Sequence, residues 1–270
     1  MIDSQPTGTS AQPIGVFDSG VGGISVLKHI RALLPHEDLL YFADSRYAPY
    51  GNKSQEFIRE RSSYLADFLI KQGAKSLVVA CNTATAAAIN ALRESYSIPI
   101  IGMEPAVKPA AAATKTGVVG VLATVGTLKS AQFAALLEHY GQGVKVVTEG
   151  CPGLVECIER GELAAPETRR LVRNYLEPLL AAGADTIVLG CTHYPFVRPL
   201  IEEIVGSEVA LIDTGAAVAR QLQKRLAESG LFTQEEELGR IRFWSNSPSS
   251  EVDRVVSCLW GEQAELVLSA

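Results

Sequence analysis

The sequence has 270 residues, of which 47% are hydrophobic, and this is enough for two modest α/β domains or one large domain with buried cores. Its 24 basic and 30 acidic residues give a net charge of -6 without long runs of one sign, which argues against nucleic acid or an anionic membrane as a partner. No apolar run reaches the roughly 18 residues of a membrane span.

The first 13 residues, MIDSQPTGTSAQP, lack the charged and apolar regions of a signal peptide, and we expect residues 1–13 to form a flexible leader. Five cysteines, an odd number, fit a reducing compartment better than a disulfide framework. The sequence therefore predicts a cytoplasmic protein.

Short apolar runs alternate with longer segments of helical periodicity, a pattern typical of parallel sheets covered by helices. Strands are predicted at Ile14 to Phe17, Leu39 to Phe42, Leu77 to Ala80, Ile98 to Gly102, Gly117 to Leu122, Val144 to Val147, Thr186 to Leu189 and Val209 to Ile212. The clearest helix runs from an N-cap at Ser54 to Gln72, before Gly73. One face of this helix is predicted to carry Phe57, Tyr64, Leu65, Phe68 and Leu69.

The two halves of the chain repeat their strand-end motifs. The pairs are Asp18 and Thr124, Cys81 and Cys191, and Glu104 and Asp213. Successive members are 63 and then 23 residues apart in the first half, and 67 and then 22 in the second. This spacing predicts a structural duplication, in which two pseudo-symmetric, doubly wound α/β domains with mainly parallel sheets face each other across a cleft.

After the second half, the sequence predicts a helix, a short strand and a last helix, which we expect to return to the first domain. Their ranges are Gly215 to Leu226, Arg242 to Trp244 and Val252 to Trp260. The first domain would then comprise residues 14–108 and 214–270, and the second residues 109–213, with a linker near Pro105 to Thr116.

Cys81 and Cys191 each follow an apolar strand and precede a helix-forming segment. A helix N-terminus lowers the pKa of a thiol toward neutrality, where thiol and thiolate are both available for acid/base work, and His193 could assist Cys191. Two opposed acid/base groups suit a proton transfer at carbon, such as racemisation. The alternative is that strand-end cysteines are buried packing residues, as we expect for Cys151, Cys157 and Cys258.

Other ligand sites are less well supported by the sequence. A zinc site of Cys81, Cys191 and His193 would lack a Cys-x-x-Cys pair or a second histidine at ligand spacing, so no metal is predicted. The glycine-rich segment after Asp18 matches neither a dinucleotide fingerprint nor a P-loop. We expect Asp18 and Ser19 to face the cleft while the glycines permit a tight turn, although Asp18 could also be a helix cap.

Four motifs together resemble the glutamate racemase family of the aspartate/glutamate racemase superfamily. They are Val16-Phe-Asp-Ser-Gly-Val-Gly-Gly, Pro49-Tyr-Gly, Ala80-Cys-Asn-Thr-Ala and Gly190-Cys-Thr-His-Tyr-Pro. The resemblance implies an enzyme without cofactor or metal that interconverts L- and D-glutamate by a two-base 1,1-proton transfer at Cα and supplies D-glutamate for peptidoglycan. It implies that Cys81 removes the α-proton of D-glutamate and Cys191 that of L-glutamate.

The resemblance also assigns further site residues. Asp18 matches an auxiliary group beside Cys81, and His193 one beside Cys191; a family glutamate matches Glu159, with Glu156 one turn away as the alternative. The implied substrate contacts are Asp18, Ser19, Tyr50, Gly51, Asn82, Thr83, Thr124, Thr192 and His193, with Thr127 as a further candidate. The loop from Arg46 to Lys53 could cover this site.

Two other functions remain open at this point. One is a related racemase acting on aspartate, a hydantoin or a malonate. The other is a non-catalytic module that binds glutamate. The only small-molecule partner that we expect is the glutamate substrate, and the chain could associate as a homodimer.

Overall fold

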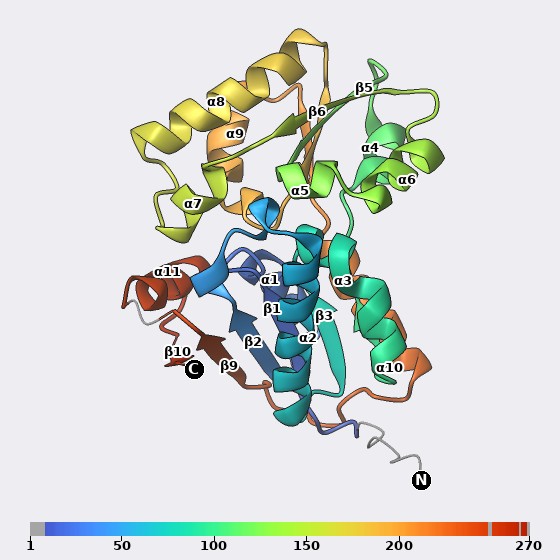
Figure 1. Ribbon diagram of the computed structural model, residues 1–270, viewed down its shortest axis with the longest axis vertical. Coiled ribbons are helices and arrows are strands. Elements are labelled where there is room, and N and C mark those ends of the chain that lie inside the picture. Colours follow the sequence, from blue (N-terminus) through green and yellow to red (C-terminus); the bar gives the residue numbers. More distant parts are fainter. Residues whose placement is uncertain (1–8, 248–249, 265, 269–270) are drawn as a thin grey trace.

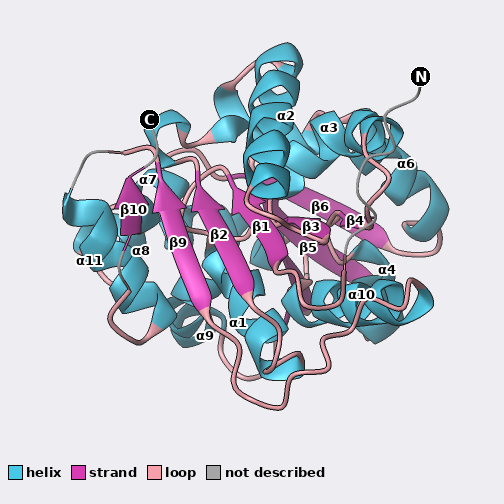
Figure 2. Ribbon diagram, turned by 90° about the horizontal axis from the view of Figure 1, so that it is seen from below, coloured by secondary structure: helices cyan, strands magenta, loops and turns pink. Residues whose placement is uncertain are grey.

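The strands of the computed structural model, which describes residues 9–247, 250–264 and 266–268, form two parallel sheets in two lobes (Figure 1). The first lobe holds the sheet β10-β9-β2-β1-β3-β4, whose strands lie side by side in Figure 2. Its strands are β1 (Ile14–Asp18), β2 (Leu39–Ala43), β3 (Ser76–Val79), β4 (Ile100–Ile101), β9 (Ile241–Ser245) and β10 (Leu266–Leu268). The second lobe holds the sheet β6-β5-β7-β8, with β5 (Val118–Ala123), β6 (Lys145–Gly150), β7 (Thr186–Gly190) and β8 (Ala210–Ile212).

The order β2-β1-β3-β4 in the first sheet is repeated as β6-β5-β7-β8 in the second, and all of these pairs are parallel. The predicted structural duplication and α/β fold are therefore confirmed. The predicted strand at Arg242 to Trp244 belongs to β9, which pairs with β2 in the first sheet. Strand β10 was missed, and the domain boundaries stay a prediction. The expected linker contains helix α4 (Val107–Ala113), which packs on β5 and β7.

Helices cover both faces of the first sheet. Helices α1 (Ile24–Leu33), α10 (Gly215–Glu228) and α11 (Ser250–Trp260) cover one face, and α2 (Gln55–Lys71) and α3 (Asn82–Ser95) the other. Because successive side chains of a strand point to opposite faces, Tyr41 packs with the first group and Phe42 with the second. Two short 3₁₀ helices, η1 (Ser45–Tyr47) and η2 (Tyr50–Asn52), follow β2.

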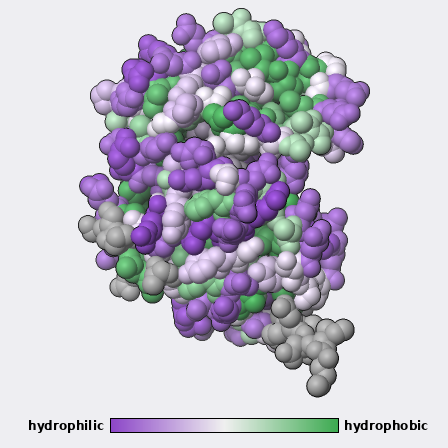
Figure 3. Space-filling view, in the orientation of Figure 1, coloured by the Kyte–Doolittle hydropathy of each residue, from purple (hydrophilic) through white to green (hydrophobic). Residues whose placement is uncertain are grey.

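The second sheet is covered in the same way. Helices α7 (Leu154–Glu159), α8 (Pro166–Ala181) and α9 (Arg198–Val205) line one face, and α4 and α6 (Ala131–Tyr140) the other. The short α5 (Val125–Leu128) follows β5, and η3 (Tyr194–Val197) follows β7. Hydrophilic side chains are spread over both lobes on the face shown in Figure 3. Within the described ranges, no helix has the length and apolar character needed to cross a bilayer.

Helix α2 begins as predicted, since the Ser54 side chain accepts a hydrogen bond from the Phe57 backbone N–H at 3.2 Å. The predicted apolar face is wrong for Tyr64, which is 41% exposed. Its ring lies over the Arg61 guanidinium group, 4.5 Å away, because the buried stripe of the helix runs through Ile58 and Leu65 instead.

Three cysteines were predicted to be packing residues, and the structure buries Cys151 and Cys157. The prediction is wrong for Cys258, which is exposed. Helix α11 turns Val255 and Leu259 into the core, and Cys258 lies on the outward side of the helix.

The segment before β1 is connected to the first lobe by a buried lysine. Residues 1–8 of the expected leader lie outside the described residues. Lys75 donates from Nζ to the Ser10 carbonyl oxygen at 2.6 Å and to Glu37 Oε2 at 2.5 Å. Both charged side chains are almost fully buried, and this burial lowers the pKa of Lys75.

We expect Lys75→Met to lower the free energy of unfolding by about 3–5 kcal/mol, because the Glu37 carboxylate would remain buried without its cation. Denaturant unfolding measures this loss. In the double variant Lys75→Met, Glu37→Leu the cost should be much smaller, since no unpaired charge is left. An equal or larger loss in the double variant would contradict this account.

Candidate active site

The carboxyl ends of strands from both sheets meet where the two lobes face each other, and a small pocket lies between them. The pocket is lined by Ser19, Pro49, Tyr50, Gly51, Cys81, Asn82, Thr83, Thr124, Val155, Gly190, Cys191, Thr192 and His193. The structure thus brings both strand-end cysteines and eight of the nine expected substrate contacts together. The ninth, Asp18, is fully buried behind Ser19.

Cys81 is the N-cap residue of α3, and its sulfur accepts a hydrogen bond from the Ala84 backbone N–H at 3.4 Å. The thiol in turn donates to Ser19 Oγ at 3.7 Å. Asp18 Oδ1 accepts from the Ser19 backbone N–H, and Oδ2 from that of Gly23, both at 2.7 Å. Asp18 therefore acts as a local cap for the turn after β1 and also lies beside the Cys81 thiol.

The expectation that the helix N-terminus lowers the thiol pKa is wrong for Cys81. Burial raises the pKa of this thiol well above its usual range, and the nearby Asp18 carboxyl raises it further. The hydrogen bond from Ala84 acts in the opposite direction but is outweighed. Burial also raises the pKa of Asp18, although His193 partly offsets this effect. Burial and the Asp18 carboxyl group thus favour the protonated thiol at Cys81.

Cys191 follows β7 and lies beside an imidazole. Its sulfur is 3.7 Å from His193 Nδ1, and His193 Nε2 is 2.6 Å from Glu159 Oε1. Burial acts to lower the pKa of His193, but hydrogen bonds to Cys191 and Glu159 outweigh it and hold this pKa well above its usual range. Of the two candidate glutamates, the structure brings Glu159 to His193, whereas Glu156 lines another small pocket beside Pro152.

The glycines after β1 do not serve the purpose expected from the sequence. Gly20 and Gly22 have no positive φ, so the turn does not require their conformational freedom. A Cβ atom at Gly20 would lie 1.9 Å from Glu159 Oε1, and one at Gly22 would lie 2.2 Å from His193 Nδ1. The glycines are needed because the loop of the first lobe packs directly against the Glu159–His193 pair of the second.

Hydroxyl groups connect the two lobes at the pocket. Thr192 Oγ1 donates to Asp18 Oδ2 at 3.4 Å, so a residue next to Cys191 contacts the carboxyl group beside Cys81. Thr83 of the first lobe meets Thr124 and Thr127 of the second, at oxygen-to-oxygen distances of 2.9 and 3.2 Å. Thr127 thus belongs to the hydroxyl cluster but does not line the pocket itself.

The loop between Arg46 and Lys53 contributes Pro49, Tyr50 and Gly51 to the pocket. The Tyr50 hydroxyl donates to the buried Asp44 carboxylate, which also accepts from Arg61 at 2.6 Å. A further hydrogen bond to Asp44, at 2.6 Å, comes from Asn246 after β9.

Sequence reasoning did not identify Asp44, Arg61 or Asn246 as residues that support the site. A signal was present for Asp44, because it directly follows β2, much as Asp18 ends β1. The partners Arg61 and Asn246 are 17 and 202 residues away from Asp44, and no local pattern connects them.

Asn82 carries an unpaired amide at the pocket. Its side chain is 4% exposed, and among the described residues neither Nδ2 nor Oδ1 has a hydrogen-bond partner. Because buried polar groups are rarely left unsatisfied, this amide is available to a polar ligand.

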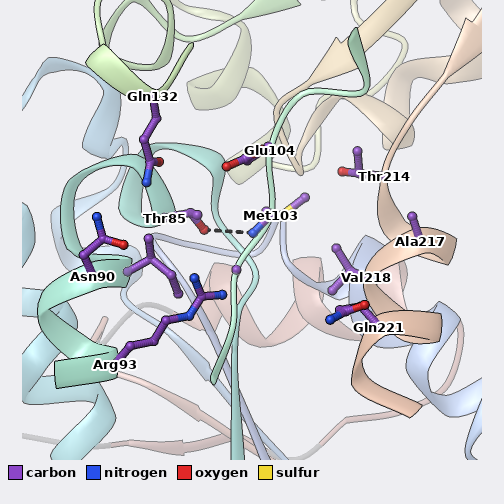
Figure 4. A pocket seen from close by; sticks show the side chains of 12 residues that line it. Thr85, Asn90, Arg93, Met103, Glu104, Gln132, Thr214, Ala217, Val218 and Gln221 are labelled. Carbon is purple, nitrogen blue, oxygen red and sulfur yellow. Dashed lines mark hydrogen bonds between the residues drawn. The ribbon is translucent and has the colours of Figure 1, made fainter. Parts of the chain in front are cut away.

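A second and larger pocket lies beside α3 and α10, at the connection that follows β4 (Figure 4). Arg93, Glu104, Gln132 and Gln221 are among its lining residues, and Thr85 Oγ1 accepts a hydrogen bond from the Met103 backbone N–H at 3.1 Å. No cysteine lines this pocket. Of the two pockets, only the smaller one between the lobes therefore contains the two strand-end cysteines.

Residues 14–222 match the protein family described as Asp/Glu/Hydantoin racemase, and the chain belongs to this family. It is 60% identical over 258 residues to the glutamate racemase of Ectopseudomonas mendocina, covering 95% of this chain and 98% of the relative. Glutamate racemase RacE1 of Bacillus anthracis superimposes with a TM-score of 0.88 at 33% identity, over 97% of this chain and 98% of that one.

A Francisella tularensis glutamate racemase, solved in complex with D-glutamate, has a TM-score of 0.84 at 30% identity, over 97% of this chain and 98% of that one. Within the family, the chain thus falls in the glutamate racemase group and is an amino-acid racemase.

Proposed function

We propose that this enzyme interconverts L- and D-glutamate by removing the α-proton from one face of Cα and delivering a proton to the other face, with Cys81 and Cys191 as the two acid/base groups. The observation that carries the proposal is that the two thiols enter one pocket from opposite lobes. Cys81 would take the α-proton of D-glutamate while the Cys191 thiol protonates the other face, and the roles reverse for L-glutamate. Each transfer leaves the protein with one thiol and one thiolate, so the protons balance.

The two bases have different partners. Asp18 would accept or return a proton at Cys81, since its own raised pKa brings a carboxylic acid closer to the thiol in acidity. His193, held by Glu159, would stabilise the thiolate of Cys191 as an imidazolium ion. The half-sites are thus chemically unequal although the fold that presents them is duplicated.

Substrate binding relies on neutral donors. The unpaired Asn82 amide and the hydroxyl groups of Thr83, Thr124 and Thr192 lie at the pocket, and α3 points its N-terminus toward it. Such donors bind carboxylates and stabilise the negative charge that develops on the α-carboxylate after proton loss. No cofactor or metal is part of this proposal.

The wider assignment follows from the same activity. The enzyme would supply D-glutamate for peptidoglycan synthesis in the cytoplasm. It would associate as a homodimer, and each chain would have one domain at residues 14–108 with 214–270 and a second at residues 109–213. Glutamate complexes of relatives support the substrate.

The proposal is tested by incubating the protein with L-glutamate in deuterium oxide without pyridoxal phosphate or added metal. We expect inversion to D-glutamate with deuterium at Cα, read by optical rotation and mass spectrometry, because a proton lost from one face is replaced from solvent-exchanged thiol on the other. Faster turnover of aspartate would favour the related racemase. Thermal stabilisation by glutamate without deuterium incorporation would favour a binding module.

A further inference from the structure

Glu159 belongs to the second lobe, yet it is held largely by the first. It is the last residue of α7, and its side chain is 14% exposed. Its Oε1 atom accepts a hydrogen bond from the Val21 backbone N–H at 2.8 Å, and Oε2 accepts one from the Ser45 hydroxyl at 3.3 Å. In its own lobe it contacts His193. The carboxylate therefore bridges the loop after β1, the turn after β2 and the imidazole beside Cys191.

The first-lobe side of this bridge is closely packed and hydrogen-bonded. Gly20 lies so close to Glu159 that even a Cβ atom there would overlap its carboxylate. Ser45 directly follows Asp44, whose carboxylate is fixed by Arg61 and Asn246. A hydroxyl group mounted on such a frame can select one orientation of the Glu159 carboxylate.

The orientation of Glu159 is passed on by direct contacts to only one of the two thiols. His193 Nδ1 faces Cys191, and its Nε2 atom faces Glu159, so the carboxylate fixes the plane and the protonation of the ring. The charged groups that face the ring are Asp18 from β1, Glu159 from α7 and Cys191 from the end of β7. Cys81 is served by Asp18 and Ser19 instead.

We propose that Ser45 is a positioning residue for the proton transfer at Cys191, acting through Glu159 and His193 across the boundary between the lobes. This rests on the proposed two-cysteine function. Its consequence is that the turn after β2 of the first sheet supports the base of the second sheet, whereas the hydrogen bonds of the first base run to its own lobe.

The test is Ser45→Ala, with Ser45→Thr as the variant that keeps the hydroxyl group. We expect Ser45→Ala to lower kcat/KM by roughly three- to tenfold, as for the loss of one hydrogen bond of ordinary strength. The loss must be equal in both directions, because the two enantiomers have equal free energies. Ser45→Thr should retain most of the activity.

The selective readout is the primary isotope effect on kcat/KM in each direction. If only the proton transfer at Cys191 is slowed, removal of the α-proton becomes more rate-limiting for L-glutamate and less so for D-glutamate. The isotope effect should therefore grow with α-deuterated L-glutamate and shrink with α-deuterated D-glutamate. Ser54→Ala is the matched control, since Ser54 only caps α2, and it should leave both isotope effects unchanged. Glu159→Gln should shift them in the same sense as Ser45→Ala.

An unchanged ratio of the two isotope effects in Ser45→Ala, or a shift in the opposite sense, would overturn the role of Ser45. Those results leave the two-cysteine function intact. Failure of that function would instead appear in the unsubstituted enzyme, as turnover without any exchange of the α-proton.

Discussion

Replacing either pocket cysteine by serine, as Cys81→Ser or Cys191→Ser, is expected to lower racemisation of glutamate by roughly 10³-fold or more. A serine hydroxyl is far too weak an acid to exchange a proton at the same position, and no other thiol lines the pocket. Because the enantiomers have equal free energies, kcat/KM falls equally in both directions. Polarimetry from each enantiomer measures this loss.

Exchange of the α-proton for deuterium, measured without inversion at Cα, distinguishes the roles of the two thiols. With Cys191→Ser, the remaining Cys81 should still allow slow deuterium entry at Cα of D-glutamate but not of L-glutamate, and Cys81→Ser should give the reverse. Cys258→Ser is the control, since Cys258 is an exposed residue of α11 and should leave turnover unchanged. Full turnover in either pocket variant, or exchange with the same enantiomer in both, would contradict the two-base mechanism.

The fold was accessible from the sequence because buried parallel strands appear as short apolar runs, and strand-end residues repeat at matched spacing. Strand β10 was missed since Leu266–Leu268 is a three-residue edge strand without a distinctive pattern. The prediction that Tyr64 lies on the apolar face of α2 was also wrong. Its spacing fits the buried stripe, but the aromatic ring is better placed over the Arg61 guanidinium at the surface.

The candidate site was predictable in its residues but not in its electrostatics. Asp18, Cys81, Cys191 and His193 could be named because each lies at or shortly after a strand end. The direction of the Cys81 pKa shift depends on burial and on the distance to Asp18, and neither is encoded locally in the sequence. Ser45 could not be found, because it reaches Glu159 across 114 residues of sequence.

The glycines show most clearly what the sequence could not provide. A glycine-rich turn after a strand is usually explained by backbone freedom, yet Gly20 and Gly22 have ordinary φ angles. What requires them is the Glu159–His193 pair of the other lobe, which leaves no room for a side chain. Their role therefore becomes visible only when the two lobes are placed against each other.

Gly22→Ala is accordingly expected to lower kcat/KM by roughly 100-fold, because displacement of a catalytic group by about 1 Å can cost that much. The new methyl group would meet His193 Nδ1, the atom that faces Cys191. The free energy of unfolding should fall by about 1–3 kcal/mol, as for other overpacked sites. The rate and the unfolding transition are measured on the same preparation, so that loss of folded protein is not mistaken for loss of rate.

A double-mutant cycle with His193→Ala identifies the cause. With the imidazole removed, the methyl group of Gly22→Ala has space, and the second substitution should cost little further activity or stability. The effects of Gly22→Ala and His193→Ala on the rate are then strongly non-additive. The coupling free energy between the two substitutions should be close to the whole effect of Gly22→Ala alone. Additive losses would mean that Gly22 acts through the backbone of its own loop, and the contact between the lobes would not be the reason for this glycine.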